Sequence, residues 1–409
     1  MEKVFITGRG LLTPLGNGLA ANEAALREGK SGITVVPEFV EKHLTSVVGG
    51  VPDQDPECEF LDRKTKRFSP PAAVMSVAAA VEAFTEAGIP LDKVSEYPMA
   101  LVGGQASSNA LEIHSLAQAY LDRNFNLRAV SPFAVPRIMP SSSISVLSLL
   151  FGIRGESFDV SAACSTSALS VAQAVRLIRS GEYDMVLVGG AEQIDWTCAL
   201  GFCACRALAT AYNDTPEKAS RPFSASRDGF VLAAGAAYML LESERSVRAR
   251  GAKPICEISG IGGNSSASDM VVPDADASSG VMAKALANAG LNISDIGYIN
   301  THGTATPVGD KVEIEAIRRL VGSGKCPAIN STKSQTGHMV GATGAAEIIF
   351  SSIMLEKQFI SPSINCEDLD PEFADVDIVR EYRECAFDHA ISNSFAFGGS
   401  NVSVVISKC

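Results

Sequence analysis

The residue whose surroundings best suit a nucleophile is Cys164, within Ser161-Ala-Ala-Cys164-Ser-Thr-Ser-Ala168. A short β-rich run at 157–160 precedes this stretch, and a long apolar segment at 168–178 follows it. A strand, a tight turn of small residues and a helix start would place the thiol beside unpaired backbone N–H groups, which favour a thiolate. A buried structural cysteine gives the same local pattern, so both interpretations remain open at this point.

Two of the five histidines lie in loops where a site is expected. His302 follows a predicted strand at 296–300, and His338 ends the segment 333–338 shortly before an apolar helix. Both loops fall at the carboxyl ends of strands, where open α/β sheets bind ligands. One thiol with one imidazole would suit a hydrolase. A second imidazole suits a different task, in which two donors stabilise an enolate oxygen while carbon attacks.

A third loop, 393–401, carries Phe395 and Phe397 among glycines. These rings could be core packing, or a gate on a pliable backbone whose N–H groups bind an oxyanion. No Cys/His cluster at ligand spacing in the sequence supports a metal. No G-x-G-x-x-G opens a helix, and Gly29-Lys30-Ser31 ends a helix instead of opening one, so no nucleotide is implied.

Continuous apolar strands that alternate with helices predict an α/β fold with a parallel sheet covered on both faces. The Ala- and Ser-rich helix at 165–179 is expected to lie between sheets, because its first three turns carry few charges. The order of elements begins again near residue 252, which predicts two packed, duplicated halves, 1–251 with the cysteine and 252–409 with both histidines and the Phe-rich loop. Strands are expected at 4–7, 99–102, 185–188, 237–241, 254–258, 296–300 and twice within 389–407, and helices at 20–27, 72–87, 165–179, 281–289, 311–320 and 344–356.

Composition indicates a cytoplasmic globular protein. The 409 residues are 46% hydrophobic, and the ten cysteines lack the regular spacing of a disulfide framework. The sequence shows neither a signal peptide nor a membrane span. The net charge of −12 argues against nucleic acid. The basic run 63–67 is either a solvated helix start or a local dock for an acidic partner.

Four motifs together resemble the β-ketoacyl-acyl carrier protein synthases of the elongating type (I and II), which have the thiolase fold. The motifs are Ala163–Ala168, Asn300–Asp310, Ser331–His338 and Asn393–Asn401, and the likeness runs from Val4 to about Ile406. The resemblance implies duplicated halves whose mixed sheets sandwich buried helices. The Cys-His-His set separates this chain from initiating synthases, which have Cys-His-Asn, and from thiolases, which have a second cysteine.

By this resemblance, Cys164 takes the acyl chain from carrier-protein phosphopantetheine. His302 and His338 polarise the malonyl thioester, so that loss of CO2 leaves an enolate that attacks the acyl group. Lys333 is the supporting lysine, and the backbone N–H groups of Cys164 and Phe397 form the oxyanion hole. The resemblance implies no cofactor besides the carrier's phosphopantetheine, and a homodimer or a heterodimer with a sister subunit.

Further residues match positions that the family uses. Thr304 and Thr306 match the pantetheine-contacting threonines, and Phe395 belongs to the gate. Ala106 and Ala134 are small where relatives carry Ile and Phe, which predicts a roomier acyl tunnel, and the second would reach across a dimer interface. The structural monovalent-cation site of some relatives corresponds to Asn300, Glu347, Ser392 and Asn393. The predicted dock for an acidic carrier protein comprises Arg63, Lys64, Lys66, Arg67, Arg128 and Arg206.

Some departures from the family pattern affect the prediction. Ala396 stands where the family has Gly in the gate, which would stiffen a hinge if that position needs a positive φ. Ser400 and Ala305 replace Thr and Ser. Two alternatives to a condensing enzyme remain: a non-catalytic chain-length partner, which typically lacks the cysteine, and a thioester hydrolase, which needs a path for water.

Overall fold

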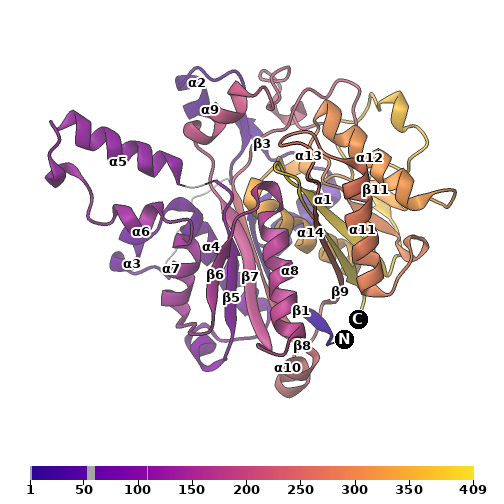
Figure 1. Ribbon diagram of the computed structural model, residues 1–409, viewed down its shortest axis with the longest axis horizontal. Helices are drawn as coiled ribbons and strands as arrows, with labels where there is room; N and C mark the ends of the chain where they lie inside the picture. Colours follow the sequence, from indigo (N-terminus) through magenta and orange to yellow (C-terminus); the bar gives the residue numbers. More distant parts are fainter. Residues whose placement is uncertain (1, 53–59, 108) are drawn as a thin grey trace.

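The computed structural model describes residues 2–52, 60–107 and 109–409. Its centre is an 11-stranded sheet with the strand order β11-β10-β14-β15-β9-β1-β8-β7-β5-β6, and β2 pairs with β1 (Figure 1). The strands from the first part of the chain are β1 (Val4–Thr13), β2 (Gly16–Asn17), β5 (Ala100–Gly104), β6 (Ser157–Val160), β7 (Met185–Glu192) and β8 (Gly235–Ser243). The later strands are β9 (Cys256–Ser265), β10 (Tyr298–Asn300), β11 (Ala328–Asn330), β14 (His389–Phe395) and β15 (Ser400–Ser407).

The sheet is mixed, where strand–helix alternation alone predicted a parallel sheet. β5 pairs in parallel with β6 and β7, and β10 with β11 and β14. β8 pairs antiparallel with β1 and β7, and β9 with β1 and β15. Antiparallel neighbours need no crossover helix, so strands such as β14 and β15 follow one another directly in the chain.

Helices lie in three layers around the two parts of the sheet. α8 (Thr166–Arg179) and α14 (Thr343–Lys357) pack side by side between them, and every residue of α14 from 343 to 355 is buried (Figure 1). A helix that is apolar on all sides requires cover on all sides, which this central layer provides. α4 (Pro71–Glu86) and α7 (Ser142–Phe151) cover the far face of the first part, and α11 (Ala275–Ala289) and α12 (Pro307–Val321) cover the second.

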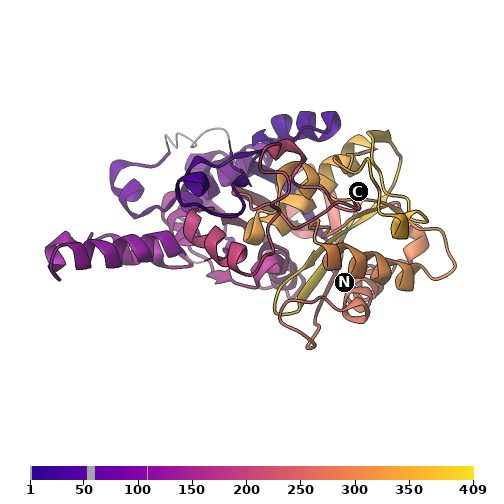
Figure 2. The same cartoon turned by 90° about the horizontal axis from the view of Figure 1, so that it is seen from above.

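Most predicted elements are present, and their bounds differ from the predicted ones by one to several residues. α1 (Leu19–Glu28), α4, α8, α11, α12 and α14 correspond to the six predicted helices, and the strands β1, β5, β7, β8, β9, β10, β14 and β15 to the predicted strands. One further helix, α5 (Ala110–Asp122), was not predicted from the sequence. This helix extends away from the body of the molecule, and none of its residues is buried (Figure 2). In the described ranges, no helix has the length and apolar character to cross a membrane.

Candidate active site

The turn that carries Cys164 is a sharp elbow between β6 and α8. Ala163 adopts φ 46°, a left-handed conformation that costs a non-glycine residue about 1 kcal/mol or more and is sustained by surrounding contacts. The N–H of Ala162 donates to Thr166 Oγ1 at 2.8 Å. Ser165 Oγ lies 2.9 and 2.7 Å from the carbonyl oxygens of Ser394 and Ser400. The nucleophile's turn is therefore tied directly to the strands that bracket the Phe-rich loop.

The two histidines come from loops that follow adjacent parallel strands. His302 follows β10, and Glu313 on α12 accepts the backbone N–H groups of His302 and Gly303, each at 2.8 Å. His338 follows β11 and the short helix α13 (Lys333–Thr336), and its N–H donates to the Val231 carbonyl at 2.7 Å. These contacts fix both loops at one edge of the sheet, as the sequence analysis predicted.

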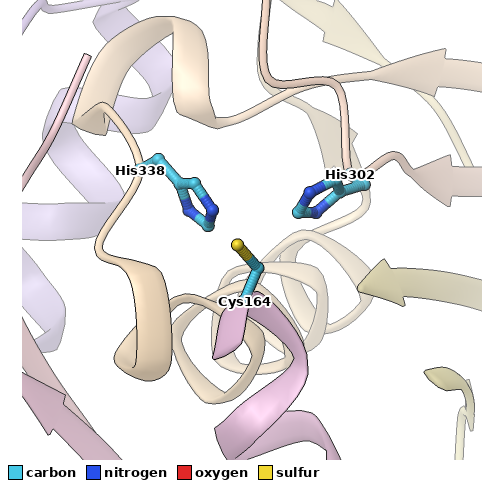
Figure 3. Close-up of side chains that lie close together, drawn as sticks. All are labelled: Cys164, His302 and His338. Carbon is cyan, nitrogen blue, oxygen red and sulfur yellow. The ribbon is translucent and has the colours of Figure 1, made fainter. Parts of the chain in front are cut away.

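Cys164, His302 and His338 meet at one point. One ligand-capable atom of each residue, the sulfur or a ring nitrogen, lies within 4.8 Å of the other two. Figure 3 shows the two rings on opposite sides of the sulfur. The three residues line a cavity of about 300 Å³ together with other residues singled out from the sequence: Thr304, Thr306, Phe395, Phe397 and Arg206.

Both imidazoles are neutral at ordinary pH. Burial holds the pKa of His302 and of His338 well below its usual range, and the positive charge of Lys333 lowers both further. His338 Nδ1 lies 3.0 Å from Thr343 Oγ1, and its Nε2 is buried without a hydrogen-bond partner among the described residues. When the Thr343 hydroxyl donates to Nδ1, Nε2 carries the proton and can donate into the cavity.

The Cys164 thiol is protonated at rest, which corrects the expectation of a thiolate. Burial raises its pKa to about 11, while Lys333 and the backbone N–H groups of Phe397 and of Cys164 itself lower it only in part. Deprotonation therefore requires an acceptor, and a neutral imidazole stands within reach. The same N–H groups of Phe397 and Cys164 lie beside the reacting sulfur, and the oxyanion hole that they are expected to form stays a prediction.

Lys333 and Glu347 form a buried ion pair beneath the site. Lys333 Nζ lies 2.8 Å from both carboxylate oxygens of Glu347, and each side chain is 1% exposed. Removing either partner would leave an uncompensated buried charge, so the pair acts as a unit. Lys333 does not line the cavity, but its field acts on Cys164 and on both imidazoles.

The Phe-rich loop connects β14 and β15 and is anchored at both ends. The N–H of Gly398 donates to the Met270 carbonyl at 2.8 Å, and the N–H of Ala396 donates to the Ser400 carbonyl at 3.0 Å. Gly398 and Gly399 supply the positive φ values of the turn, 82° and 77°. Ala396 is not among the residues with positive φ, so alanine fits this conformation without strain.

Ala106 and Ala134 are not among the residues that line the cavity around Cys164. Ala106 packs in the apolar cluster that includes Cys164, Phe202 and Phe230, and Ala134 is buried at the start of α6 (Ala134–Ile138). The predicted widening of the acyl tunnel at these two positions stays a prediction.

Two of the four residues of the implied monovalent-cation site, Asn300 and Ser392, are neighbours in the structure. Asn300 and Ser392 are direct partners of parallel strands, and Asn300 Oδ1 is buried without a hydrogen-bond partner among the described residues. This free oxygen suits a hard cation. Asn393 Oδ1 already accepts from Ser403 at 2.8 Å, and Lys333 occupies the Glu347 carboxylate. Only some of the oxygens of these four residues are therefore free to bind a monovalent cation.

The six cations of the predicted dock are exposed but do not form one group. Four lie on α3 (Arg63–Phe68), which packs near α6 and α7, and Arg128 lies in η2 (Leu127–Ala129). Arg206 follows α9 (Trp196–Ala204) and lines the cavity. In the described ranges of the chain, none of the six has a carboxylate within 4.0 Å.

Buried carboxylates around the site were not assigned a role from the sequence. Glu313 holds the His302 loop, and burial raises its pKa to about 7. Asp310 accepts from the N–H groups of Phe223 (2.9 Å) and Ala305 (3.0 Å). Asp310 is the last residue of the motif Asn300–Asp310, so the sequence did contain a signal for its role. Glu313 lies outside that motif, and no sequence pattern marked it.

The structure also assembles a possible metal-ligand set that sequence spacing could not reveal. The sulfur and two neutral ring nitrogens come from residues 164, 302 and 338, which lie far apart in the chain. Soft thiolate and imidazole ligands in this number suit Zn²⁺. Spacing along the sequence could therefore not predict this set of ligands, which is the one such set among the residues that the structure describes.

One mixed sheet whose two parts enclose buried helices, with a Cys-His-His centre at a helix start, is the arrangement of an acyltransferase with the thiolase-like fold. A model described as the N-terminal domain of β-ketoacyl synthases matches residues 1–246, and one for the C-terminal domain matches residues 255–367. The chain belongs to the β-ketoacyl synthase family.

Individual relatives cover the whole chain. It is 42% identical to the 3-oxoacyl-[acyl-carrier-protein] synthase 1 of Haemophilus influenzae, over 100% of this chain and 99% of that protein. Among solved structures, a β-ketoacyl synthase from Burkholderia phymatum has a TM-score of 0.94 at 31% identity, covering 100% of both chains. The ishigamide ketosynthase/chain length factor has a TM-score of 0.93 at 28% identity, covering 100% of this chain and 99% of that one.

Proposed function

We propose that this chain condenses an acyl group on Cys164 with malonyl-acyl carrier protein, releasing CO2 and a β-ketoacyl-acyl carrier protein. The observation that carries the proposal is the meeting of the Cys164 sulfur with one nitrogen from each of two neutral imidazoles within 4.8 Å. The named function of the 42% identical relative supports the same reaction in fatty-acid synthesis. The assay below, run with carrier-bound acyl chains of graded length and unsaturation, distinguishes fatty-acid elongation from a related polyketide or polyene pathway.

In the first step, Cys164 attacks the acyl thioester of the carrier. An imidazole accepts the thiol proton, and the N–H groups of Phe397 and Cys164 bind the tetrahedral oxyanion. The C–S bond to the carrier's phosphopantetheine breaks, the released thiolate takes a proton, and the free carrier dissociates. The acyl group is then held by a C–S bond to Cys164. Thr304 and Thr306, whose hydroxyls lie 3.1 Å apart on the cavity wall, would contact the pantetheine arm.

In the second step, malonyl-carrier enters the same cavity. The C–C bond to its carboxylate breaks, CO2 leaves, and His302 and His338 donate to the enolate oxygen. The enolate carbon attacks the acyl carbon, a new C–C bond forms, and the C–S bond to Cys164 breaks. The Cys164 thiolate then takes up one proton, which solvent supplies and an imidazole can relay, so that the thiol and both neutral imidazoles are restored. The residues require no further cofactor for either step.

The test is mass spectrometry of protein and products after incubation with acyl- and malonyl-loaded carrier. The wild-type chain should form an acyl adduct on Cys164 and a β-ketoacyl thioester two carbons longer, whereas Cys164→Ala should do neither. Condensation by that variant would overturn the proposal. Free acid as the main product would favour a hydrolase. Inactivity of the wild-type chain alone, with activity in the presence of a sister subunit, would favour a chain-length partner.

The proposed carrier dock uses both groups of cations. Arg206 at the cavity and the exposed cations of α3 lack carboxylate partners within 4.0 Å in the described part of the chain, so they are available to an acidic surface. On one protomer these groups lie on different elements (Figure 1). A dimer would allow one carrier to contact both.

Pairing with a second copy, or with a sister subunit, is supported by an uncovered apolar surface. It runs from the projecting α5 through η2 and α6 to α7, beside the edge strand β6. Its exposed apolar side chains are Ile113, Leu121, Phe125, Leu127, Val135 and Leu149, which are 45–75% exposed. Large exposed apolar patches mark interaction sites.

A monovalent cation at Asn300, Ser392, Asn393 and Glu347 would be structural.

A further inference from the structure

Glu192, the last residue of β7, is a fully buried carboxylate that the reaction above does not use. Its Oε2 accepts the backbone N–H groups of Ala106 and Gly341, each at 3.0 Å. Its Oε1 accepts the N–H of Ser107 at 3.2 Å and the Ser107 hydroxyl. Each of these groups donates, so both carboxylate oxygens act as acceptors. The carboxylate thereby joins two segments, 106–107 and 340–342, that are far apart in the chain.

The segment held through Gly341 is the turn that follows His338. This turn, η6 (Val340–Ala342), packs against η3 (Ala163–Ser165), which carries Cys164. Val340 adopts φ 40°, which is a strained conformation for a β-branched residue. A Cβ on Gly341 would lie 2.6 Å from the Ala106 nitrogen and 2.7 Å from Glu192 Oε2. The turn is therefore strained and tightly enclosed, and an anchor is needed to keep it in place.

The other segment, 106–107, packs beside the nucleophile. Ala106 belongs to the apolar cluster that contains Cys164. The backbone of His338 itself is held by hydrogen bonds with the backbone of Val231 and Ala233. The His338 loop thus has one anchor at His338 itself, before the strained Val340, and one at Gly341, through Glu192, directly after Val340. The ring position depends on both, because a small displacement of a catalytic group lowers the rate strongly.

We infer that Glu192 is a positioning residue for condensation, which holds the His338 imidazole and the wall beside Cys164 in one geometry. The inference rests on the proposed function and assigns Glu192 no contact with substrate. Acyl loading of Cys164 needs one imidazole as proton acceptor, a role that His302 can fill, and the oxyanion hole from Cys164 and Phe397. Condensation needs both imidazoles, so it also requires His338 to meet the enolate. Loss of the anchor should therefore slow condensation more than it slows loading.

The test is Glu192→Gln, with acyl loading and condensation measured separately on the same preparation. Because both carboxylate oxygens accept, either orientation of the new amide points its NH2 at backbone N–H donors. We expect kcat for condensation to fall on the order of 10- to 100-fold and the loading rate to fall much less. The matched control is Glu82→Gln on α4. Glu82 also accepts two backbone N–H groups, from Leu11 (2.9 Å) and Leu19 (2.7 Å), and does not line the cavity.

A general loss of stability would lower both rates together and lower Tm in both variants. An unchanged ratio of condensation to loading in Glu192→Gln would therefore overturn the inference. If that variant does not fold, Ser107→Ala, which removes one donor, should shift the ratio in the same direction by a smaller factor, and an unchanged ratio there would also overturn it. Failure of the wild-type chain to condense would count against the proposed function and not against the role of Glu192.

Discussion

The imidazole rings of His302 and His338 stand nearly perpendicular, with centroids 5.4 Å apart and an interplanar angle of 85°. Rings in this edge-to-face arrangement do not stack, and one nitrogen of each lies within 4.8 Å of the Cys164 sulfur. Cys164 lies between them (Figure 3). One small oxygen atom beside the sulfur can therefore be met from two directions, which suits an enolate better than a hydrolase intermediate.

The first prediction concerns these two rings. His302→Ala or His338→Ala should each lower kcat for condensation on the order of 100- to 1,000-fold, because each removes one donor to the enolate. Intact-protein mass spectrometry should still detect an acyl adduct on Cys164, since the remaining imidazole can accept the thiol proton and the oxyanion N–H groups are unchanged. Equal losses of loading and condensation in both variants would contradict the assigned roles. The exposed His43 provides the control substitution.

The second prediction concerns the protonation of the nucleophile. Because burial raises the pKa of Cys164 to about 11, the thiolate fraction should grow about tenfold for each pH unit between pH 7 and pH 10. The rate of alkylation by a small neutral haloacetamide, followed at Cys164 by mass spectrometry, should rise accordingly. A rate that is already independent of pH from pH 7 upward would show that the resting form is a thiolate and would contradict the prediction. The exposed Cys205 serves as an internal reference.

Zinc should inhibit the enzyme by binding Cys164, His302 and His338 together. Their ligand atoms lie within 4.8 Å, and tetrahedral zinc needs only small movements to reach its usual bond lengths of about 2.0–2.3 Å. Chelation should restore activity, and Mg²⁺ should have no such effect. Prior acylation of Cys164 removes the thiolate ligand, so the acyl-enzyme should be protected. Equal inhibition of free and acylated enzyme would contradict the site.

The fourth prediction concerns Asp159 on β6. Burial raises the pKa of its carboxyl to about 7, and Oδ1 has no hydrogen-bond partner among the described residues. The protonated form is favoured in the fold, so its stabilising effect is complete below the ordinary pKa and is lost as pH rises through 7. In Asp159→Asn this loss is absent. The free energy of unfolding of the variant should therefore gain on the wild type by about 2–3 kcal/mol between pH 5 and pH 8.

Chemical denaturation at fixed protein concentration would measure that difference. The variant and the wild type should differ least at pH 5. A difference that is the same at both pH values would mean that Asp159 ionises normally in the fold.

The fifth prediction concerns the carrier dock. Arg206→Glu places a negative charge at the cavity and should raise KM for carrier-bound acyl groups several-fold, with little effect on a small acyl thioester. The effect should weaken as salt rises, because screening reduces steering between exposed charges. Arg248→Glu on α10 (Glu244–Arg250), which lies at the other end of the molecule from α9 in Figure 1, is the control. Equal changes for both substrates would argue against a dock at Arg206.

The sequence by itself determined the local chemistry. Cys164, His302, His338 and Phe397 each stand within a few residues of the turn or helix start that presents them, so short motifs are sufficient to recognise them. Apolar periodicity likewise predicted the helices of both halves, since burial of one face or of a whole helix leaves a pattern in consecutive residues. The projecting helix α5 was not predicted, because a helix without buried residues leaves no such pattern in the sequence.

Only the tertiary structure decided which distant groups meet and what charge they carry. The protonated Cys164 and the two neutral imidazoles follow from burial and from the nearby Lys333, which depend on packing across both halves. Glu192 is separated by 149 positions from the Gly341 N–H that it accepts, and no local pattern links them. Desolvation and long-range hydrogen bonds depend on the order of the strands in the sheet, because that order brings the loops into contact.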